Sequence, residues 1–416
     1  MPVTAWLLFV LGLWSLSATA SALFRLRHPA HAGFMVMLTS WLVGEYPLFQ
    51  IVLQMVIAAL LIGGADEMLG AIGLAAYLVS WVGLVVVRVI QTRARPAAER
   101  ALAAGLGDDY LDALAAERRS ALRTRRERGL ALLPMHFDRS ALTIISDVAY
   151  GPARRNRLDV YRPNRAAGPL PVVLQVHGGA WVLGHKAQQA LPLLHRLASH
   201  GYVCVSINYR LAPKSKFPEP LVDVKRAIAW VRDHIADHGG DPDLIILTGG
   251  SAGGHLVSLA ALTANDPAYQ SGFESADTSV AACMPFYGPF DFTNRFGIRG
   301  RTSTMEQFLR RTVMPGSMAE HPDLYEAMSP IAHVRPDAPP FLIIQGKLDV
   351  LVWREETRAF VERLTEASAA PVVYWEVPGA QHAFDNFNSL RSSVAVDTCE
   401  RFAGWVVART TADRVE

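Results

Sequence analysis

The sequence predicts an all-α transmembrane region followed by an α/β domain, which has a mostly parallel sheet of eight strands, helices on both faces and a small cap. Three observations support this prediction. Long uncharged apolar stretches are concentrated near the N-terminus. From residue 142 onward, short β-branched runs alternate with helical patterns. A Gly-x-Ser-x-Gly motif at 249–253 stands between one of those runs and a helical segment.

Three apolar stretches come close to the length that crosses a bilayer. A membrane-spanning helix needs ~20 residues, and the stretches cover residues 4–24, 47–63 and 69–87. A shorter apolar piece at 34–43 either extends the second span as a kinked helix or lies in the membrane interface, with a break at 45–47. The alternative to three spans is a buried layer of helices in a soluble protein.

The charges beside the spans predict their orientation. The loop after the second span carries Asp66 and Glu67, whereas arginines follow the first and third spans. These arginines are Arg25, Arg27, Arg88, Arg93 and Arg95. Because positive residues mark the cytoplasmic side, we expect a multi-pass membrane protein with a cytoplasmic α/β domain. The competing interpretation is a cleaved signal peptide at 4–22, although no Lys or Arg precedes that run.

The predicted domains are therefore a transmembrane region at 1–95, a basic helical linker at 96–140 and an α/β catalytic domain at 141–416. The linker is rich in Ala, Leu and Arg, and its arginines cluster between 118 and 128. Its simplest interpretation is a solvated stalk. The alternative is attraction to anionic lipid headgroups, worth about 1 kcal/mol per charge near the surface.

Eight strand-like runs define the predicted sheet. Helical stretches at 222–238 and 354–367 separate later runs, and the segment 288–340 is long enough to add a cap. In such sheets, active groups lie at the carboxyl ends of the strands. The runs cover residues 142–149, 158–161, 172–176, 203–207, 244–247, 280–287, 341–345 and 372–377.

Ser251 is the predicted nucleophile. It lies at the centre of the motif at 249–253, after an apolar run and before a helix-like segment. A nucleophile at such a sharp turn is strained and needs small neighbours, so that its Oγ can stand clear of the sheet. The helix N-terminus that follows favours developing negative charge.

The segment 177–181, His-Gly-Gly-Ala-Trp, is the predicted oxyanion loop because it directly follows the run 172–176. Acyl transfer places negative charge on a carbonyl oxygen, and one preorganised N–H donor lowers the barrier by about 3 kcal/mol. We expect Gly178, Gly179 and Ala252 to supply these donors. Trp181 is expected to line the substrate pocket, and His177 to shape the loop.

Asp349 and His382 are the predicted acid and base of the site. Each lies in a loop just after a strand-like run. The imidazole would take the Ser251 proton and later return one to the leaving group, while the carboxylate orients the ring. Asp385 and Asp337 are the alternative acids.

These motifs together resemble the hormone-sensitive-lipase-like branch of the α/β-hydrolases, which includes bacterial esterases and arylacetamide-deacetylase-like enzymes. The resemblance runs from about residue 142 to the C-terminus, through 177–181, the Tyr-Arg-Leu-Ala-Pro segment at 209–213, 249–253, Asp349 and His382. It implies the α/β-hydrolase fold and the chain order serine, acid, histidine. Ala180 departs from the pattern, since many members carry a third glycine there.

The resemblance implies a serine carboxylesterase or lipase that hydrolyses hydrophobic acyl esters through an acyl-enzyme, and the three apolar stretches predict that this enzyme is anchored in the membrane. An amidase or deacetylase on the same triad remains an alternative, as does an inactive hydrolase-like scaffold. We expect a small-molecule or lipid ester as substrate, contact with membrane lipids, and no cofactor, metal or nucleic acid. The net charge is only +2, and the three cysteines, Cys204, Cys283 and Cys399, lack metal-ligand spacing. The sequence leaves the oligomeric state open.

Overall fold

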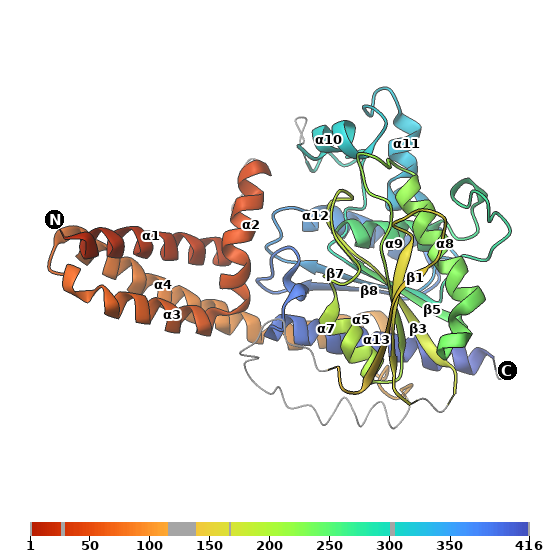
Figure 1. Cartoon of the computed structure of the whole chain (residues 1–416), viewed down its shortest axis with the longest axis horizontal. Coiled ribbons are helices and arrows are strands. Elements are labelled where there is room, and N and C mark those ends of the chain that lie inside the picture. The colour runs from red at the N-terminus through yellow and green to blue at the C-terminus, as the bar shows by residue number, and fades with distance from the viewer. Residues whose placement is uncertain (1, 26–29, 115–138, 166–167, 300–303, 415–416) are drawn as a thin grey trace.

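The computed structural model describes residues 2–25, 30–114, 139–165, 168–299 and 304–414. An arm of helices extends from a larger α/β domain, and the N-terminus lies at the far tip of the arm (Figure 1). Arg27 and the arginines at 118–128 lie outside the described residues.

Three helices form the arm, and a fourth stands at its base. Within the arm, α1 (Val3–Leu23), α3 (Pro47–Leu60) and α4 (Met68–Thr92) run side by side, with a short 3-10 turn, η1 (Ile62–Gly64), at the tip (Figure 1). At the base, α2 (Ala30–Glu45) meets α3 at Tyr46 with a bend of 100°. The apolar piece at 34–43 therefore lies on a helix that is sharply bent relative to α3.

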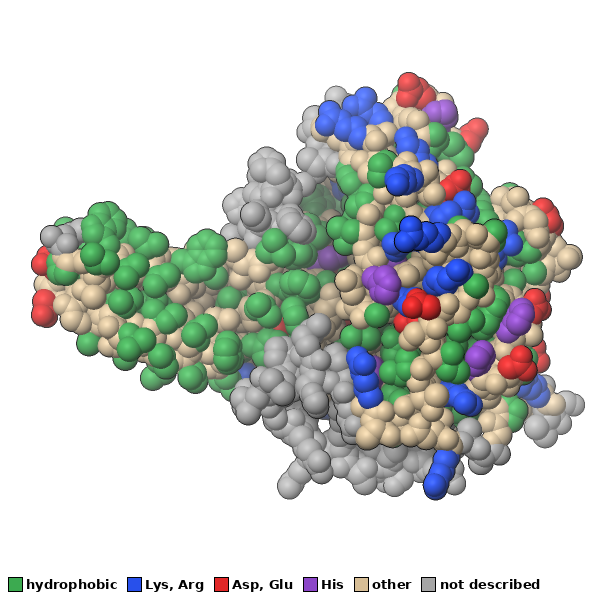
Figure 2. Space-filling view, viewed as in Figure 1, with side chains coloured by type: hydrophobic (Ala, Val, Ile, Leu, Met, Phe, Trp, Pro, Cys, Tyr) green, Lys and Arg blue, Asp and Glu red, His purple; other side chains and the backbone are tan. Residues whose placement is uncertain are grey.

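The arm places polar groups inside and apolar side chains outside. Thr19 Oγ1 lies 2.8 Å from Ser80 Oγ, which also donates to Gln54 Oε1 at 3.0 Å. Helices α1 and α4 approach so closely that a Cβ on Gly12 would lie 2.2 Å from the Gly73 carbonyl oxygen. The outer surface is largely hydrophobic (Figure 2), with Trp6, Val10, Trp14, Phe49, Val52, Val79 and Val82 all at least half exposed.

Two helices of the described chain, Val3–Leu23 and Met68–Leu106, are long and apolar enough to cross a membrane. The bent pair Met37–Glu45 and Pro47–Leu60 would make a third span if both parts are counted together. The helix α3 alone is 14 residues long, which is shorter than the ~20 residues that a membrane-spanning helix needs.

The helix α5 (Ala94–Leu106) continues α4 into the α/β domain. Ala94, Ala98 and Leu102 are buried in the same hydrophobic cluster as Val373 of the sheet and Phe402. This differs from the solvated stalk that we expected for the start of the linker. The alanine-rich face allows close packing on the sheet, which the overall Ala, Leu and Arg composition did not reveal.

The sheet contains the eight predicted strands in the order β1-β2-β4-β3-β5-β6-β7-β8. The strand β2 is antiparallel to both β1 and β4, and the other pairs are parallel. The prediction of a mostly parallel sheet is confirmed. The strands are β1 (Leu142–Ala149), β2 (Arg157–Pro163), β3 (Leu170–Val176), β4 (Val203–Ile207), β5 (Gly240–Gly250), β6 (Ala282–Phe286), β7 (Phe341–Gly346) and β8 (Val372–Val377).

Strand register brings the carboxyl ends of the parallel strands to one edge. Val176 of β3 is paired with Gly249 of β5, and Gly346 of β7 with Val377 of β8. The loops that follow these strands therefore start from the same edge of the sheet.

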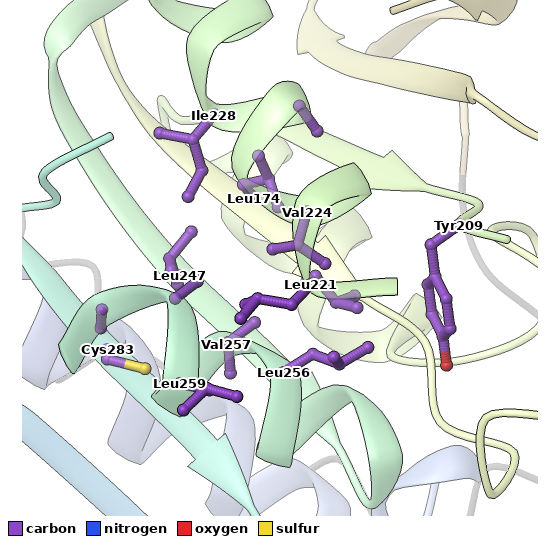
Figure 3. Close-up of a cluster of buried hydrophobic side chains, with 14 of the residues drawn as sticks. Leu174, Tyr209, Leu221, Val224, Ile228, Leu247, Leu256, Val257, Leu259 and Cys283 are labelled. Atoms are coloured by element: carbon purple, nitrogen blue, oxygen red, sulfur yellow. The ribbon is translucent and has the colours of Figure 1, made fainter. Parts of the chain in front are cut away.

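Helices cover both faces of the sheet, as predicted. One face carries α8 (Glu219–His234), α9 (Ala252–Leu262) and α12 (Arg354–Ala367). The other carries α5, α7 (Leu191–Ser199) and α13 (Leu390–Asp413). On the first face, Leu221, Val224 and Ile228 of α8 lie with Leu256, Val257 and Leu259 of α9 near Leu174 and Leu247 (Figure 3). Cys204, Cys283 and Cys399 are free and buried.

The predicted cap segment contains only short helices where it is described. They are α10 (Thr304–Phe308), a π-helical turn at Leu309–Val313, α11 (Pro322–Ala327) and a 3-10 turn at Pro330–His333. Short 3-10 turns also occur at Ile235–His238, Pro267–Tyr269 and Phe384–Asn386.

Candidate active site

Ser251 occupies a strained turn between β5 and α9. Its φ and ψ are 57° and −121°, a backbone conformation that a non-glycine residue holds only when its surroundings fix it. The Ser251 N–H donates to the Phe286 carbonyl at 2.9 Å. A Cβ on Gly253 would lie 2.0 Å from the Val176 carbonyl oxygen, so the position admits only glycine. The turn predicted from the motif is therefore present.

His382 connects Ser251 to Asp349. His382 Nε2 lies 2.9 Å from Ser251 Oγ, and His382 Nδ1 lies 2.8 Å from Asp349 Oδ2. With Nδ1 protonated and donating to the carboxylate, Nε2 is free to accept the serine hydroxyl proton. The structure thus brings together the three side chains that the sequence assigned as nucleophile, base and acid.

The Asp349 carboxylate is held by more than the histidine. Its Oδ1 accepts the N–H groups of Leu351 and Val352, each at 2.9 Å, and its Oδ2 accepts Gln345 Nε2 at 3.1 Å. The residue is only 1% exposed. A buried carboxylate with these donors is satisfied as an anion and is fixed in direction.

Neither alternative acid contacts His382 Nδ1. Asp337 is largely exposed and pairs with Arg335 at 3.5 Å. Asp385 accepts a short hydrogen bond from the Tyr287 hydroxyl, and burial raises the pKa of Asp385 to about 6. Asp385 is thus engaged by Tyr287, whereas the carboxylate that contacts His382 Nδ1 is that of Asp349.

Tyr287 is a neighbour of the site that we did not predict. Its ring centroid lies 4.6 Å from that of His382, and its hydroxyl is bonded to Asp385. The signal that could have found it is its position, since Tyr287 directly follows β6 at the edge that carries the other loops. Its ring limits the space in which the imidazole can move.

The predicted oxyanion loop lies beside Ser251. A Cβ on Gly178 would be 3.1 Å from Ser251 Cβ, and Gly179 has a φ of +117°. The Gly178 N–H already donates to Gln189 Oε1 at 2.6 Å. The Gly178 N–H can therefore bind an oxyanion only if the Gln189 side chain moves away. The neighbouring backbone N–H groups are those of Gly179, Ala180 and Ala252. The amide of Gln189 is eleven residues away in sequence and gave no signal.

Trp181 lies behind this loop and is only 2% exposed. Its indole Nε1 donates to His255 Nδ1 at 3.2 Å, and its ring packs edge to face on Phe292. So little free surface leaves the indole little to offer a substrate. The contacts indicate that Trp181 supports the loop from within the core, in contrast to the pocket-lining position that we expected.

Known proteins are similar to this chain in both sequence and fold. A family model described as BD-FAE matches residues 158–364. The esterase LipQ of Mycobacterium tuberculosis is 45% identical over 316 residues, which are 74% of this chain and 74% of LipQ. The chain belongs to the α/β-hydrolase carboxylesterases. It is an ester-hydrolysing enzyme.

Two further relatives place this carboxylesterase among proteins of similar architecture. LipM of Mycobacterium tuberculosis, a probable carboxylic ester hydrolase, is 46% identical over 63% of this chain and 61% of its own length. A truncated carbohydrate esterase from gut microbiota has a TM-score of 0.56 and 25% identity, covering 64% of this chain and 99% of that structure. The match thus spans nearly all of that truncated chain.

Two buried histidines stabilise the carboxylesterase's site as neutral rings. Burial lowers the pKa of His177 and of His255 to about 4. His177 stacks on Tyr209 with ring centroids 4.4 Å apart, and the Tyr209 hydroxyl donates to the His177 carbonyl. Since His255 Nδ1 accepts from Trp181, its Nε2 carries the proton that is donated to the Met328 carbonyl at 2.7 Å. The expected role of His177 in shaping the loop agrees with these contacts.

Acid should destabilise the carboxylesterase through His255. The unfolded histidine binds a proton near its ordinary pKa of 6.5, whereas the folded one does so only near 4. The contribution of His255 to the free energy of unfolding is therefore fully present above about pH 6.5. It declines as the pH falls toward 4, by up to about 1.4 kcal/mol per pH unit. Thermal midpoints of the parent and His255→Gln, measured in detergent from pH 7.5 to 4.5, should show a shallower profile for the variant. Parallel profiles would contradict this account.

Proposed function

We propose that this carboxylesterase is a membrane-anchored serine esterase or lipase that acts on hydrophobic acyl esters. The observation that supports the proposal most strongly is the continuous contact from Ser251 Oγ through His382 to Asp349 Oδ2, with distances of 2.9 Å and 2.8 Å. Nothing in this arrangement requires a cofactor. The motifs at 177–181 and 249–253 favour the hormone-sensitive-lipase-like branch as the origin of the site.

The proposed reaction begins with Ser251. His382 Nε2 takes the hydroxyl proton while Ser251 Oγ attacks the ester carbonyl, and the carbonyl oxygen gains negative charge. N–H groups of the oxyanion loop and of Ala252 stabilise that oxygen. Collapse breaks the bond to the alcohol, which leaves with the proton from His382. Water then attacks the acyl-enzyme by the same route, with His382 again as base, and releases the acid and free serine.

The arm supports the membrane part of the proposal. Its exposed surface is apolar over α1, α3 and α4, while Thr19, Gln54 and Ser80 are buried between the helices. A water-soluble bundle has the opposite arrangement, and exposed apolar surface of this extent marks a membrane or protein interface. We assign it to the bilayer because exposed apolar side chains occur on all three helices of the arm and cover the face of the arm that Figure 2 shows.

The substrate class follows from the same placement. An enzyme held at a bilayer meets esters that partition into that bilayer, so a lipid or other hydrophobic acyl ester fits the proposed anchor. The base of the arm lies next to the α/β domain (Figure 1). The catalytic loops are therefore close to the level at which α1 and α4 would leave the membrane.

Replacing the triad residues tests the catalytic proposal. Ser251→Ala should abolish labelling by a fluorophosphonate probe and lower ester turnover by about 10⁴-fold or more, because the nucleophile is lost. Asp349→Asn should lower turnover by a similar order because the imidazole loses its orienting anion. Both are measured with the full chain in detergent, using p-nitrophenyl butyrate. The matched control is Asp337→Asn, which changes an exposed carboxylate and should retain parent turnover. Ser251→Ala turnover within tenfold of the parent would contradict the assignment of Ser251 as the nucleophile.

The proposed topology has its own test. With Asp66 and Glu67 in the outer loop and Arg25 on the inner side, the catalytic domain is cytoplasmic. A C-terminal alkaline-phosphatase fusion should be inactive in an intact bacterial host, and a C-terminal green fluorescent fusion should be bright. The reverse pair of results would place the triad outside the cytoplasm.

A further inference from the structure

The loop that carries the catalytic base forms hydrogen bonds on both sides of His382, one with α1 of the arm and one with α2 at its base. Before it, Gln381 Nε2 donates to the Ser21 carbonyl of α1 at 3.4 Å. After it, the Ala383 carbonyl accepts the indole N–H of Trp41, on α2, at 2.9 Å. The Trp41 ring also packs on Phe387, with centroids 4.7 Å apart. Residues flanking the base are thus held by α1 of the arm and by α2 at its base.

The loop that carries the catalytic acid is held by Arg25, just beyond the end of α1. Arg25 Nε donates to the carbonyl of Asp349 itself at 3.1 Å. Its Nη1 lies 2.7 Å from both carboxylate oxygens of Glu355, and the guanidinium lies over Trp353. The Arg25 side chain is 12% exposed. Such a charge-assisted contact fixes direction as well as distance.

A buried ion pair holds the start of the base loop in the same way. Arg391 Nη1 lies 2.7 Å from Glu45 Oε1, and the two side chains are 1% and 2% exposed. Arg391 Nε donates to the carbonyl of Pro378, where the base loop begins, at 2.9 Å. Ser389 Oγ donates to the second Glu45 oxygen at 2.6 Å. The C-terminal end of α2 is therefore part of the support under the base loop.

These contacts are more than an attachment of the arm to the domain. Attachment is already provided by α5, which is buried against the sheet, and by ion pairs such as Arg95 with Asp397 at 2.8 Å. The additional contacts converge on two short loops, and they reach the backbone of Asp349 and of the residue after His382. Attachment alone does not require contacts with the carbonyl oxygens of these two residues.

We propose that the membrane arm is a structural part of the active site, in which Arg25 and Trp41 are positioning residues for Asp349 and His382. The inference rests on the proposed triad. Neither residue touches substrate. Each restrains a loop whose displacement would lengthen the contact between His382 and Asp349, and a misplacement of about 1 Å can cost up to about 10²-fold in rate. Arg25, which the sequence offers only as a marker of orientation, thus acts on the acid loop.

The test compares two single variants of the full chain in detergent. Arg25→Gln removes the charged fork, and Trp41→Phe removes the indole N–H while keeping a ring against Phe387. With p-nitrophenyl acetate, a small soluble ester, we expect kcat to fall by about ten- to 100-fold for each variant, with KM within about twofold of the parent. The rate of fluorophosphonate labelling should fall in parallel, because it needs the same serine and base.

Arg95→Gln is the matched control, since it removes an arginine ion pair between the arm's continuation and α13 without touching either catalytic loop. It should keep parent kcat. Thermal midpoints of all variants show whether each is folded, and Arg25→Lys, which keeps the charge but not the fork, should recover only part of the loss.

Parent kcat in both Arg25→Gln and Trp41→Phe, or a loss no larger than that of Arg95→Gln, would overturn the inference. Unchanged variants together with an inactive Ser251→Ala would leave the proposed triad standing. An active Ser251→Ala would remove the triad itself, so the two failures are distinguishable.

Discussion

The hydrogen bond of 2.8 Å between His382 Nδ1 and Asp349 Oδ2 is the contact on which the site depends. It joins two loops that follow neighbouring strands, so the pairing of Gly346 with Val377 sets their starting distance. Beyond those strands, the two loops remain joined by a backbone hydrogen bond, in which the Leu348 N–H donates to the Ala380 carbonyl at 2.9 Å. Backbone donors and Gln345 hold the carboxylate on one side, and the Tyr287 ring limits the imidazole on the other. Further restraint comes from the helical arm and from α2 at its base.

The arm meets two requirements at once. Toward the surroundings it presents apolar side chains, and between its helices it satisfies the hydroxyl and amide groups of Thr19, Ser80 and Gln54. At its base it presents charged and polar groups to the α/β domain, where Glu45 and Arg391 are paired and buried. Removing one partner of such a pair leaves an uncompensated charge, at a cost of about 3–5 kcal/mol. The junction is therefore specific in geometry, which suits a region that supports catalytic loops.

Much of the fold and the centre of the site could be predicted, because both depend on local patterns. Most strands were short apolar runs, and Ser251, Asp349 and His382 each followed one of the predicted runs. The exceptions depend on side chains that meet only in the folded chain. Gln189 occupies the Gly178 N–H, and His255 and Phe292 bury Trp181. Arg25 lies 324 residues from Asp349 in sequence. Sequence periodicity does not predict contacts between side chains that are far apart in the chain. The composition of 96–106 likewise could not distinguish a solvated helix from α5 packed on the sheet.

The most direct test of the supported triad is a structure of the full chain after reaction with a fluorophosphonate, determined in a lipid environment. We expect phosphorus bonded to Ser251 Oγ and a phosphoryl oxygen facing the N–H groups of Gly179 and Ala252. In the same molecule, Arg25 should donate a hydrogen bond to the Asp349 carbonyl, and Trp41 should donate one to the Ala383 carbonyl. Phosphorus on another side chain, or an arm separated from an intact triad, would contradict it.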